Sequence, residues 1–155
     1  MKELFDETGA CAIGDHSAFS FLCGENMAVL SEYFELKSVK TGETLWEEGQ
    51  PSDYVAIIRS GMIEVKKETE FEGKHVAVGI YKKGSVVGVL GILDGSPRAV
   101  TAVSLEDSSL LVITKDNFEK LIEAHPDLGI KLLKGMLLSI SMRLRKSFER
   151  LSRFF

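Results

Sequence analysis

The sequence predicts a mainly β domain of short antiparallel strands, with helices at both ends of the chain. Three observations lead to this fold class. Between residues 34 and 114, short apolar runs recur between glycine-bearing turns, a texture typical of an antiparallel sandwich or barrel. On either side of this region the apolar residues follow helical spacing. A chain of 155 residues can bury a core without disulfides or metals, so we expect residues 1–155 to form a single domain.

The segment before the strands is predicted to hold little regular structure. Residues 1–16 are mixed in character and interrupted by glycine, so we expect a loose lead-in. From Phe19 to about Glu35 the apolar residues have helical spacing that breaks near Gly24, which predicts one or two short helices.

Seven apolar runs predict the strands of the region 34–114. They are Leu36–Val39, Thr44–Trp46, Tyr54–Ile58, Met62–Val65, Val76–Tyr81, Val100–Val103 and Leu110–Ile113. Glycines between the runs stand where the chain must reverse with a positive φ, and the tightest of these turn signals is Asp94-Gly95-Ser96-Pro97.

Residues 115–155 are predicted to be helical. A short helix over 115–124 is followed by a long helix over 127–153, with a proline at the break. Read in heptads, the long helix has a seam in which seven of eight residues are apolar: Ile130, Leu133, Leu137, Ile140, Leu144, Leu151 and Phe154, with Ser147 as the exception. The helix either packs only on its own sheet, or packs there at its start and pairs with a second copy further along. We favour the second arrangement, a homodimer through helix 127–153.

The composition narrows the function classes. A formal net charge of −4 gives no reason to expect non-specific binding to nucleic acid. Cys11 and Cys23 are too few for a four-cysteine metal site, and we expect them to be reduced rather than joined in a disulfide. Neither a signal peptide nor a membrane-spanning run is visible, so we expect a cytoplasmic protein that is not bound to a membrane.

The segment 84–101 carries the candidate binding chemistry. It reads as a glycine-rich turn, one short helical turn, a second turn and an arginine that opens an apolar strand. We expect the amides of Gly88, Val89 and Leu90 to converge on an anion, because the start of a helical turn presents unpaired N–H groups and a positive dipole end. Arg98 supplies a planar charged fork that suits a phosphate. The alternative is that Arg98 is a surface charge and that the glycines only shape turns.

The ordered glycines, this cradle and the trailing helices together resemble the cyclic nucleotide-binding domain. That family is the sensor module of catabolite-activator-type regulators, cyclic-nucleotide-dependent kinases and gated channels. The resemblance covers about residues 19–150, and the residues that carry it are Gly42, Gly49, Gly61, Gly84, Gly88, Pro97 and Arg98. It implies an antiparallel β-roll (a double-stranded jelly roll) that holds a cyclic phosphate in a cassette.

The resemblance assigns roles to single residues of the cassette. The cassette's arginine falls on Arg98 and its tight-turn glycine on Gly88, and the small residues that complete the phosphate shell fall on Ala99 and Val100. The family's glutamate, which accepts hydrogen bonds from the ribose 2′-hydroxyl, falls on Val89, which cannot accept them. Loss of a hydrogen bond to a charged group weakens binding by roughly 10- to 150-fold.

The resemblance also bears on the base of the ligand. Ala99 lacks the hydroxyl that the family associates with a preference for guanine, so cyclic AMP is the favoured candidate ligand. In the family the base is often capped from the long helix, where Ser139, Arg143 and Ser147 are the polar candidates.

The sequence therefore favours a ligand-sensing regulatory domain that is not an enzyme and needs no cofactor. It would bind cyclic AMP or a related anion weakly and signal through its C-terminal helices to a downstream protein. Because of Val89, the alternative is a degenerate scaffold of the same fold that serves only dimerisation or docking. A metal enzyme of the cupin type is disfavoured because His75 has no nearby histidine. No helix-turn-helix pattern is visible, so we expect no direct DNA binding.

Overall fold

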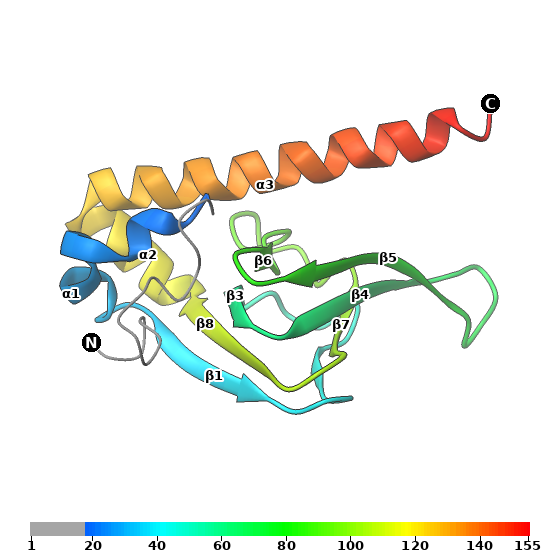
Figure 1. The fold of residues 1–155 in the computed structure, drawn as a ribbon, viewed down its shortest axis with the longest axis horizontal. Helices are drawn as coiled ribbons and strands as arrows, with labels where there is room; N and C mark the ends of the chain where they lie inside the picture. Colours follow the sequence, from blue (N-terminus) through cyan, green and yellow to red (C-terminus); the bar gives the residue numbers. More distant parts are fainter. Residues whose placement is uncertain (1–17) are drawn as a thin grey trace.

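Two four-stranded antiparallel sheets pack face to face, with helices at one end (Figure 1). The computed structural model describes residues 18–155. The first sheet has the strand order β1-β8-β3-β6 and the second the order β2-β7-β4-β5. The strands are β1 (Glu35–Val39), β2 (Thr44–Trp46), β3 (Tyr54–Ser60), β4 (Met62–Glu68), β5 (His75–Lys82), β6 (Val86–Val87), β7 (Thr101–Ser104) and β8 (Ser108–Thr114). The predicted antiparallel β-roll with flanking helices is confirmed.

The central strands β3 and β8 of the first sheet are buried on both faces, whereas the edge strand β1 is largely exposed. Along β3, Val55 and Ile57 belong to a core shared with the helices, whereas Ala56 and Ile58 belong to a core shared with the second sheet. Because successive side chains of a strand point to opposite faces, both faces must be apolar for both cores to form. This explains why β3 and β8 are nearly continuous apolar runs in the sequence.

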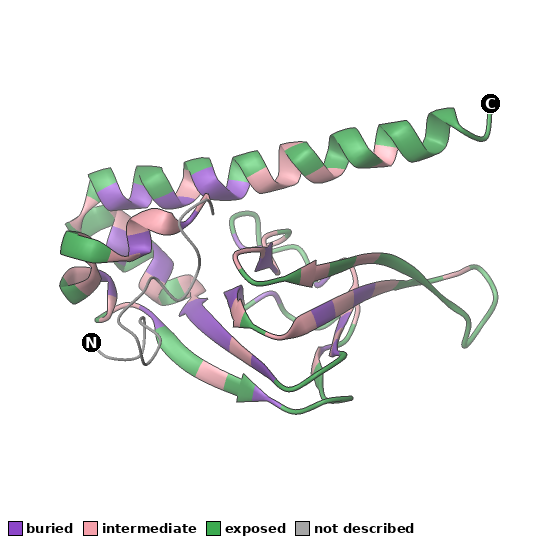
Figure 2. Ribbon diagram, in the orientation of Figure 1, coloured by how far each residue is buried: buried purple, intermediate pink, exposed green. Residues whose placement is uncertain are grey.

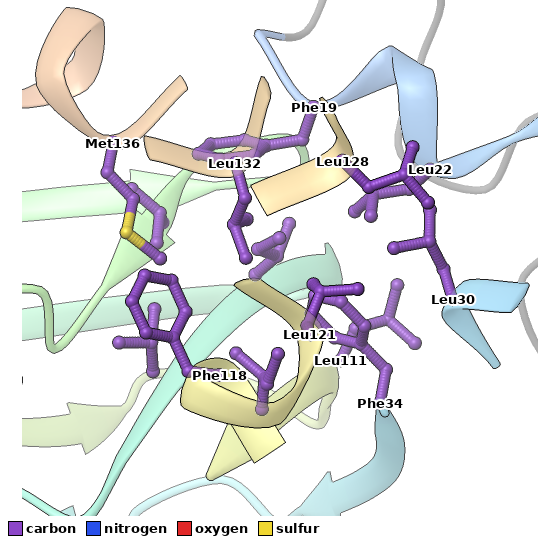
Figure 3. Close-up of a cluster of buried hydrophobic side chains, with 14 of the residues drawn as sticks. Phe19, Leu22, Leu30, Phe34, Leu111, Phe118, Leu121, Leu128, Leu132 and Met136 are labelled. Atoms are coloured by element: carbon purple, nitrogen blue, oxygen red, sulfur yellow. The ribbon is translucent and has the colours of Figure 1, made fainter. Parts of the chain in front are cut away.

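The helical core is built from the segment before the first strand and the helices after the last strand. Three short helical elements precede the first strand: η2 (Ser20–Leu22), η3 (Gly24–Asn26) and α1 (Met27–Leu30). Two helices follow the last strand: α2 (Lys115–Ala124) and the long α3 (Pro126–Ser152). In Figure 3, Phe19, Phe118, Leu132 and Met136 gather in one cluster. Thr114 caps α2 by accepting a hydrogen bond from the amide of Asn117 at 3.1 Å.

Helix α3 is buried only along its first third. Leu128, Leu132 and Met136, each four residues apart, form its core-facing stripe. From residue 137 onward every residue is exposed or half-buried, and the helix runs on over the edge of the second sheet (Figure 2). The predicted heptad seam is largely exposed there, since Leu137 has 65% of its surface accessible and Leu151 has 56%. Pairing with a second copy through this seam stays a prediction.

Two expectations from the sequence are corrected by the structure. The helical turn expected to begin at residues 88–90 lies further along: the bond from the amide of Ile92 to Val89 O at 3.3 Å closes a tight turn, and a single i→i−4 bond, from the amide of Gly95 to Gly91 O at 3.0 Å, closes one helical turn. Positive φ angles of 93° at Gly91 and 75° at Gly95 confine this turn to the three residues between them. Cys23 is disulfide-bonded rather than reduced, because sequence separation does not reveal how close two thiols lie in space.

One expectation is not tested by the structure, and one strand is absent from the predicted set. The predicted lead-in over residues 1–16 lies outside the described residues. The short strand β6 was not among the predicted strands, because its two valines are embedded in the glycine-rich segment. None of the helices within residues 18–155 combines the length and the hydrophobicity of a membrane-spanning segment.

Candidate functional site

A cavity of about 1060 Å³ lies between the segment 84–100, the strand β5 and the second half of α3. This volume is slightly above the range of about 300–1,000 Å³ that is typical of small-molecule pockets. The nine site residues expected from the sequence all contribute to its lining: Gly88, Val89, Leu90, Arg98, Ala99, Val100, Ser139, Arg143 and Ser147. Segments more than 40 residues apart in the sequence therefore meet at one hollow.

Gly88 is the position where the backbone needs the absence of a side chain. It follows β6 with a φ of 85°, which side-chain-bearing residues rarely adopt. A Cβ atom at this position would lie 2.6 Å from Arg98 Nη1 and 2.9 Å from the ring of Trp46. Glycine therefore allows the arginine and the tryptophan to close on the backbone of the turn.

The guanidinium of Arg98 is fixed within the wall of the cavity. The residue is only 3% exposed. Nη2 donates to Tyr54 O at 2.8 Å and contacts Asp53 Oδ1 at 3.4 Å, while Nη1 donates to Gly88 O at 3.2 Å. Its Cζ lies 3.9 Å from the centre of the Trp46 ring, a distance typical of a cation–π contact. The alternative that Arg98 is an ordinary surface charge is wrong, since the side chain is buried.

The buried Nε–H donor of Arg98 has no partner among the described residues. Burial lowers the pKa of the guanidinium from its ordinary value, and the nearby Tyr54 and Asp53 partly oppose this effect. The group nevertheless remains a cation near neutral pH, because an arginine starts from so high a pKa.

The turn after β6 also offers backbone donors. The amide N–H groups of Gly88, Val89 and Leu90 form no hydrogen bond with a described residue. These amides do not begin a helical turn, which lies further along at residues 91–95, but the three residues that carry them line the same cavity. Such amides can cradle an anion without a helix.

Val89 connects this turn to the helical core. It lines the cavity and is half-buried against the cluster that contains Leu132 and Met136 of α3. The position to which the family resemblance assigns a glutamate is therefore a packing contact in this chain.

The opposite wall comes from α3. Arg143 donates to the carbonyl oxygen of Val86 in β6, and its Cζ lies 3.9 Å from the centre of the Tyr81 ring. Burial lowers the pKa of the Arg143 guanidinium, an effect that Tyr81 partly opposes. One turn further along, Ser147 Oγ donates back to Arg143 O at 3.0 Å. Arg143 therefore ties α3 directly to the strand that leads into the Gly88 turn.

All the described charged side chains that line the cavity are cationic. Five cationic side chains line it, and among the described residues no aspartate or glutamate does. The five are Lys83, Arg98, Arg143, Lys146 and Arg150. A chain with a formal net charge of −4 thus concentrates positive charge at one hollow, which favours an anionic ligand.

Sequence reasoning missed several residues of this site. Trp46, which the sequence marks only as the end of an apolar run, stacks on Arg98 and donates from Nε1 to Val100 O at 3.0 Å. Tyr54 and Asp53 hold the guanidinium, and Tyr81 receives Arg143. An aromatic residue in a predicted strand carries no signal for such a contact, because the partners are 44 to 62 residues away in the chain.

The fold, together with a cavity whose described charged lining residues are all cationic, defines a ligand-binding β-roll. A comparison of sequences identifies its family. The profile of the cyclic nucleotide-binding domain matches residues 36–125. The chain belongs to this family and is a cyclic nucleotide-binding regulatory domain.

Known relatives place the same domain in several kinds of protein. The chain is 35% identical over 103 residues to the anaerobic regulatory protein of Bacillus subtilis, a match that covers 66% of this chain and 41% of that protein. It is 30% identical over 102 residues to the cAMP-dependent protein kinase regulatory subunit of Aspergillus fumigatus, covering 65% and 24%. Lysophospholipase NTE1 of Phaeosphaeria nodorum is 30% identical over 100 residues, which are 64% of this chain and only 6% of that protein.

A solved structure agrees with the fold. A cyclic nucleotide-binding domain from Methylobacillus flagellatus superposes with a TM-score of 0.78 at 25% identity, covering 84% of this chain and 73% of that one. The curated relatives described above are matched over less than half of their own length. The family is thus shown for the domain, and the similarity does not extend to the rest of those proteins.

Proposed function

We propose that this chain is a sensor domain that binds cyclic AMP, or a related anion, in the cavity beside Arg98. The buried Nε–H of Arg98 carries the proposal, because it is an unpaired donor in the wall of a cavity lined by five cations. Leaving a buried donor unpaired costs about 1–3 kcal/mol. A shift of the Arg98 side chain that brings this group to a phosphate oxygen would remove that cost, and the unbonded amides of residues 88–90 would share the charge.

The affinity is expected to be low, and adenine is the preferred base. Val89 cannot accept a hydrogen bond from a ribose hydroxyl, so the sugar end of the site contributes less than a carboxylate would. Ala99 offers no hydroxyl to a guanine. On the helix side, Ser139, Arg143 and Ser147 line the cavity and are the candidates to cap the base.

Signalling would couple the cassette to α3. Arg98 Nη1 holds the carbonyl oxygen of Gly88, and a phosphate bound to Arg98 would compete for that donor. Release of Gly88 would move its neighbour Val89, which packs on the core that includes α3. Ligand would thereby favour one packing of the terminal helices over another, a shift between populations of two arrangements.

The surrounding assignments belong to the same proposal. The domain acts in the cytoplasm as a homodimer through helix 127–153, passes its signal to a downstream protein, does not bind DNA directly and catalyses no reaction itself. The exposed apolar seam of α3 supports the dimer. The small share of the lysophospholipase that is matched supports a non-catalytic role for the domain.

Calorimetric titration with cyclic AMP and cyclic GMP tests the proposal, with adenosine as the control that lacks a phosphate. We expect heat with both cyclic nucleotides, tighter binding of cyclic AMP and none of adenosine. No heat at millimolar nucleotide, together with no shift of the melting temperature, would contradict the proposal. That result would support the alternative, a non-binding scaffold for dimerisation or docking.

A further inference from the structure

The cavity holds more positive charge than one cyclic phosphate requires. A cyclic mononucleotide carries a single negative charge, which Arg98 and the neighbouring amides can match. Four further cations line the cavity, on β5–β6 and α3: Lys83, Arg143, Lys146 and Arg150. No carboxylate among the described residues lines the cavity to neutralise them.

Three of these cations lie on one face of α3. Residues 143, 146 and 150 are three and four positions apart, so their side chains project from the same side of the helix. Arg143 is anchored to Val86 O, and Arg150 Nη1 donates to Val78 O at 3.3 Å. These bonds hold both guanidinium groups at the strands that bound the cavity.

This arrangement is unfavourable without an anion. Like charges three or four residues apart on a helix repel each other, at a cost of a few tenths of a kcal/mol per pair. Lys146 lies between the two arginines and forms no hydrogen bond or ion pair with a described residue. The side chains of Arg143 and Arg150 each donate one hydrogen bond, although a guanidinium has five N–H donors. The remaining donors suit a second phosphate.

We infer that the α3 wall forms a second anion subsite, and that the ligand is a nucleotide with two separated phosphate groups, such as a cyclic dinucleotide. One phosphate lies against Arg98 and the other against Lys146 and Arg150, while Arg143, held at Val86 O and the Tyr81 ring, stays a candidate to cap a base. The cavity volume of about 1060 Å³ accommodates a ligand larger than a mononucleotide. This inference rests on the proposed function, since it assumes that a nucleotide occupies the roll.

Calorimetry with cyclic AMP and cyclic di-AMP, which share a base and differ in phosphate number, tests the second subsite. We expect the full chain to bind cyclic di-AMP at least about tenfold more tightly, the order expected for one added charge-assisted hydrogen bond. The double variant K146Q/R150Q should lose at least about tenfold more affinity for cyclic di-AMP than for cyclic AMP. The matched control K131Q/R145Q removes two exposed cations of α3 that do not line the cavity, and should retain both affinities.

The possible results distinguish failure of the second subsite from failure of nucleotide binding itself. If cyclic AMP binds as tightly as cyclic di-AMP, or if K146Q/R150Q weakens both ligands equally, the second subsite is wrong while the proposed function stands. If neither nucleotide binds, the proposed function fails together with this inference. An equal loss of cyclic di-AMP affinity in K131Q/R145Q would show that only the overall charge matters, and would also overturn the subsite.

Discussion

Replacing Val89 by glutamate should convert the weak sugar end of the site into a strong one. The new carboxylate can accept a hydrogen bond from the ribose 2′-hydroxyl, which is worth about 1.5–3 kcal/mol and raises affinity for cyclic AMP by roughly 10- to 150-fold. Val89 is half-buried against the helical core, so its loss should cost about 1 kcal/mol of folding stability. A domain with an ordinary stability of about 5–15 kcal/mol remains folded at that cost.

The assay compares cyclic AMP with 2′-deoxy cyclic AMP in calorimetric titrations. The gain should appear only with the ligand that carries the 2′-hydroxyl. Val89→Ala is the matched control, because it removes the packing without adding a carboxylate, and it should lose stability without gaining affinity. If Val89→Glu binds cyclic AMP no more tightly than the native chain, or if the deoxy ligand gains equally, position 89 does not contact the ribose 2′-hydroxyl.

Three further predictions concern the turn, the helix and the response to acid. Gly88→Ala should lower the free energy of unfolding by about 1–3 kcal/mol in urea titrations, because the added Cβ would collide with Arg98 and the positive φ would be strained. The control Gly42→Ala has a φ of 82° but open space around the Cβ, so it should lower the free energy of unfolding less. Leu137→Glu places a charge on the exposed α3 seam and should shift the protein to monomer in sedimentation experiments. The hydrogen bonds from Lys67 and Glu68 lower the pKa of Glu48, so stability should fall as pH drops from Glu48's ordinary value through its folded one, with a shallower decline in Glu48→Gln.

Each of these predictions has a contradicting outcome. Equal costs for Gly88→Ala and Gly42→Ala would mean that the contact with Arg98 is unimportant. A native chain that sediments as a monomer at micromolar concentration would contradict the seam. A native chain whose urea midpoint does not change between pH 5 and pH 3 would contradict the role of Glu48, because a group with a lowered folded pKa binds protons more readily when unfolded.

Local pattern predicted the strands and helices well. The apolar run Tyr54–Ile58 lies within β3, and Lys115–Ala124 coincides with α2, because burial on fixed faces leaves a periodic trace in the sequence. The heptad seam of the long helix was less informative. The stripe that faces the core, Leu128 to Met136, is offset from it, since apolar residues on a long helix can serve its own domain or a partner.

The site could be predicted from one wall only. Gly88 and Arg98 lie ten positions apart within the glycine-rich segment, so the sequence alone predicts this anion-binding wall. The stacking of Trp46 on Arg98 and the cations of α3 arise from segments about 50 residues away, which only the fold brings together. The packing of Val89 on the helical core likewise depends on tertiary contacts.

The central claim is that Arg98 binds the phosphate of a nucleotide in the roll cavity, and titration of cyclic AMP into the native chain and Arg98→Lys tests it most directly. Lysine keeps a positive charge but loses the planar fork and the buried Nε–H. We expect the native chain to bind, and the variant, at a temperature where circular dichroism shows it folded, to bind at least about tenfold more weakly. Equal affinities, or no heat from the native chain at millimolar cyclic AMP, would contradict the claim.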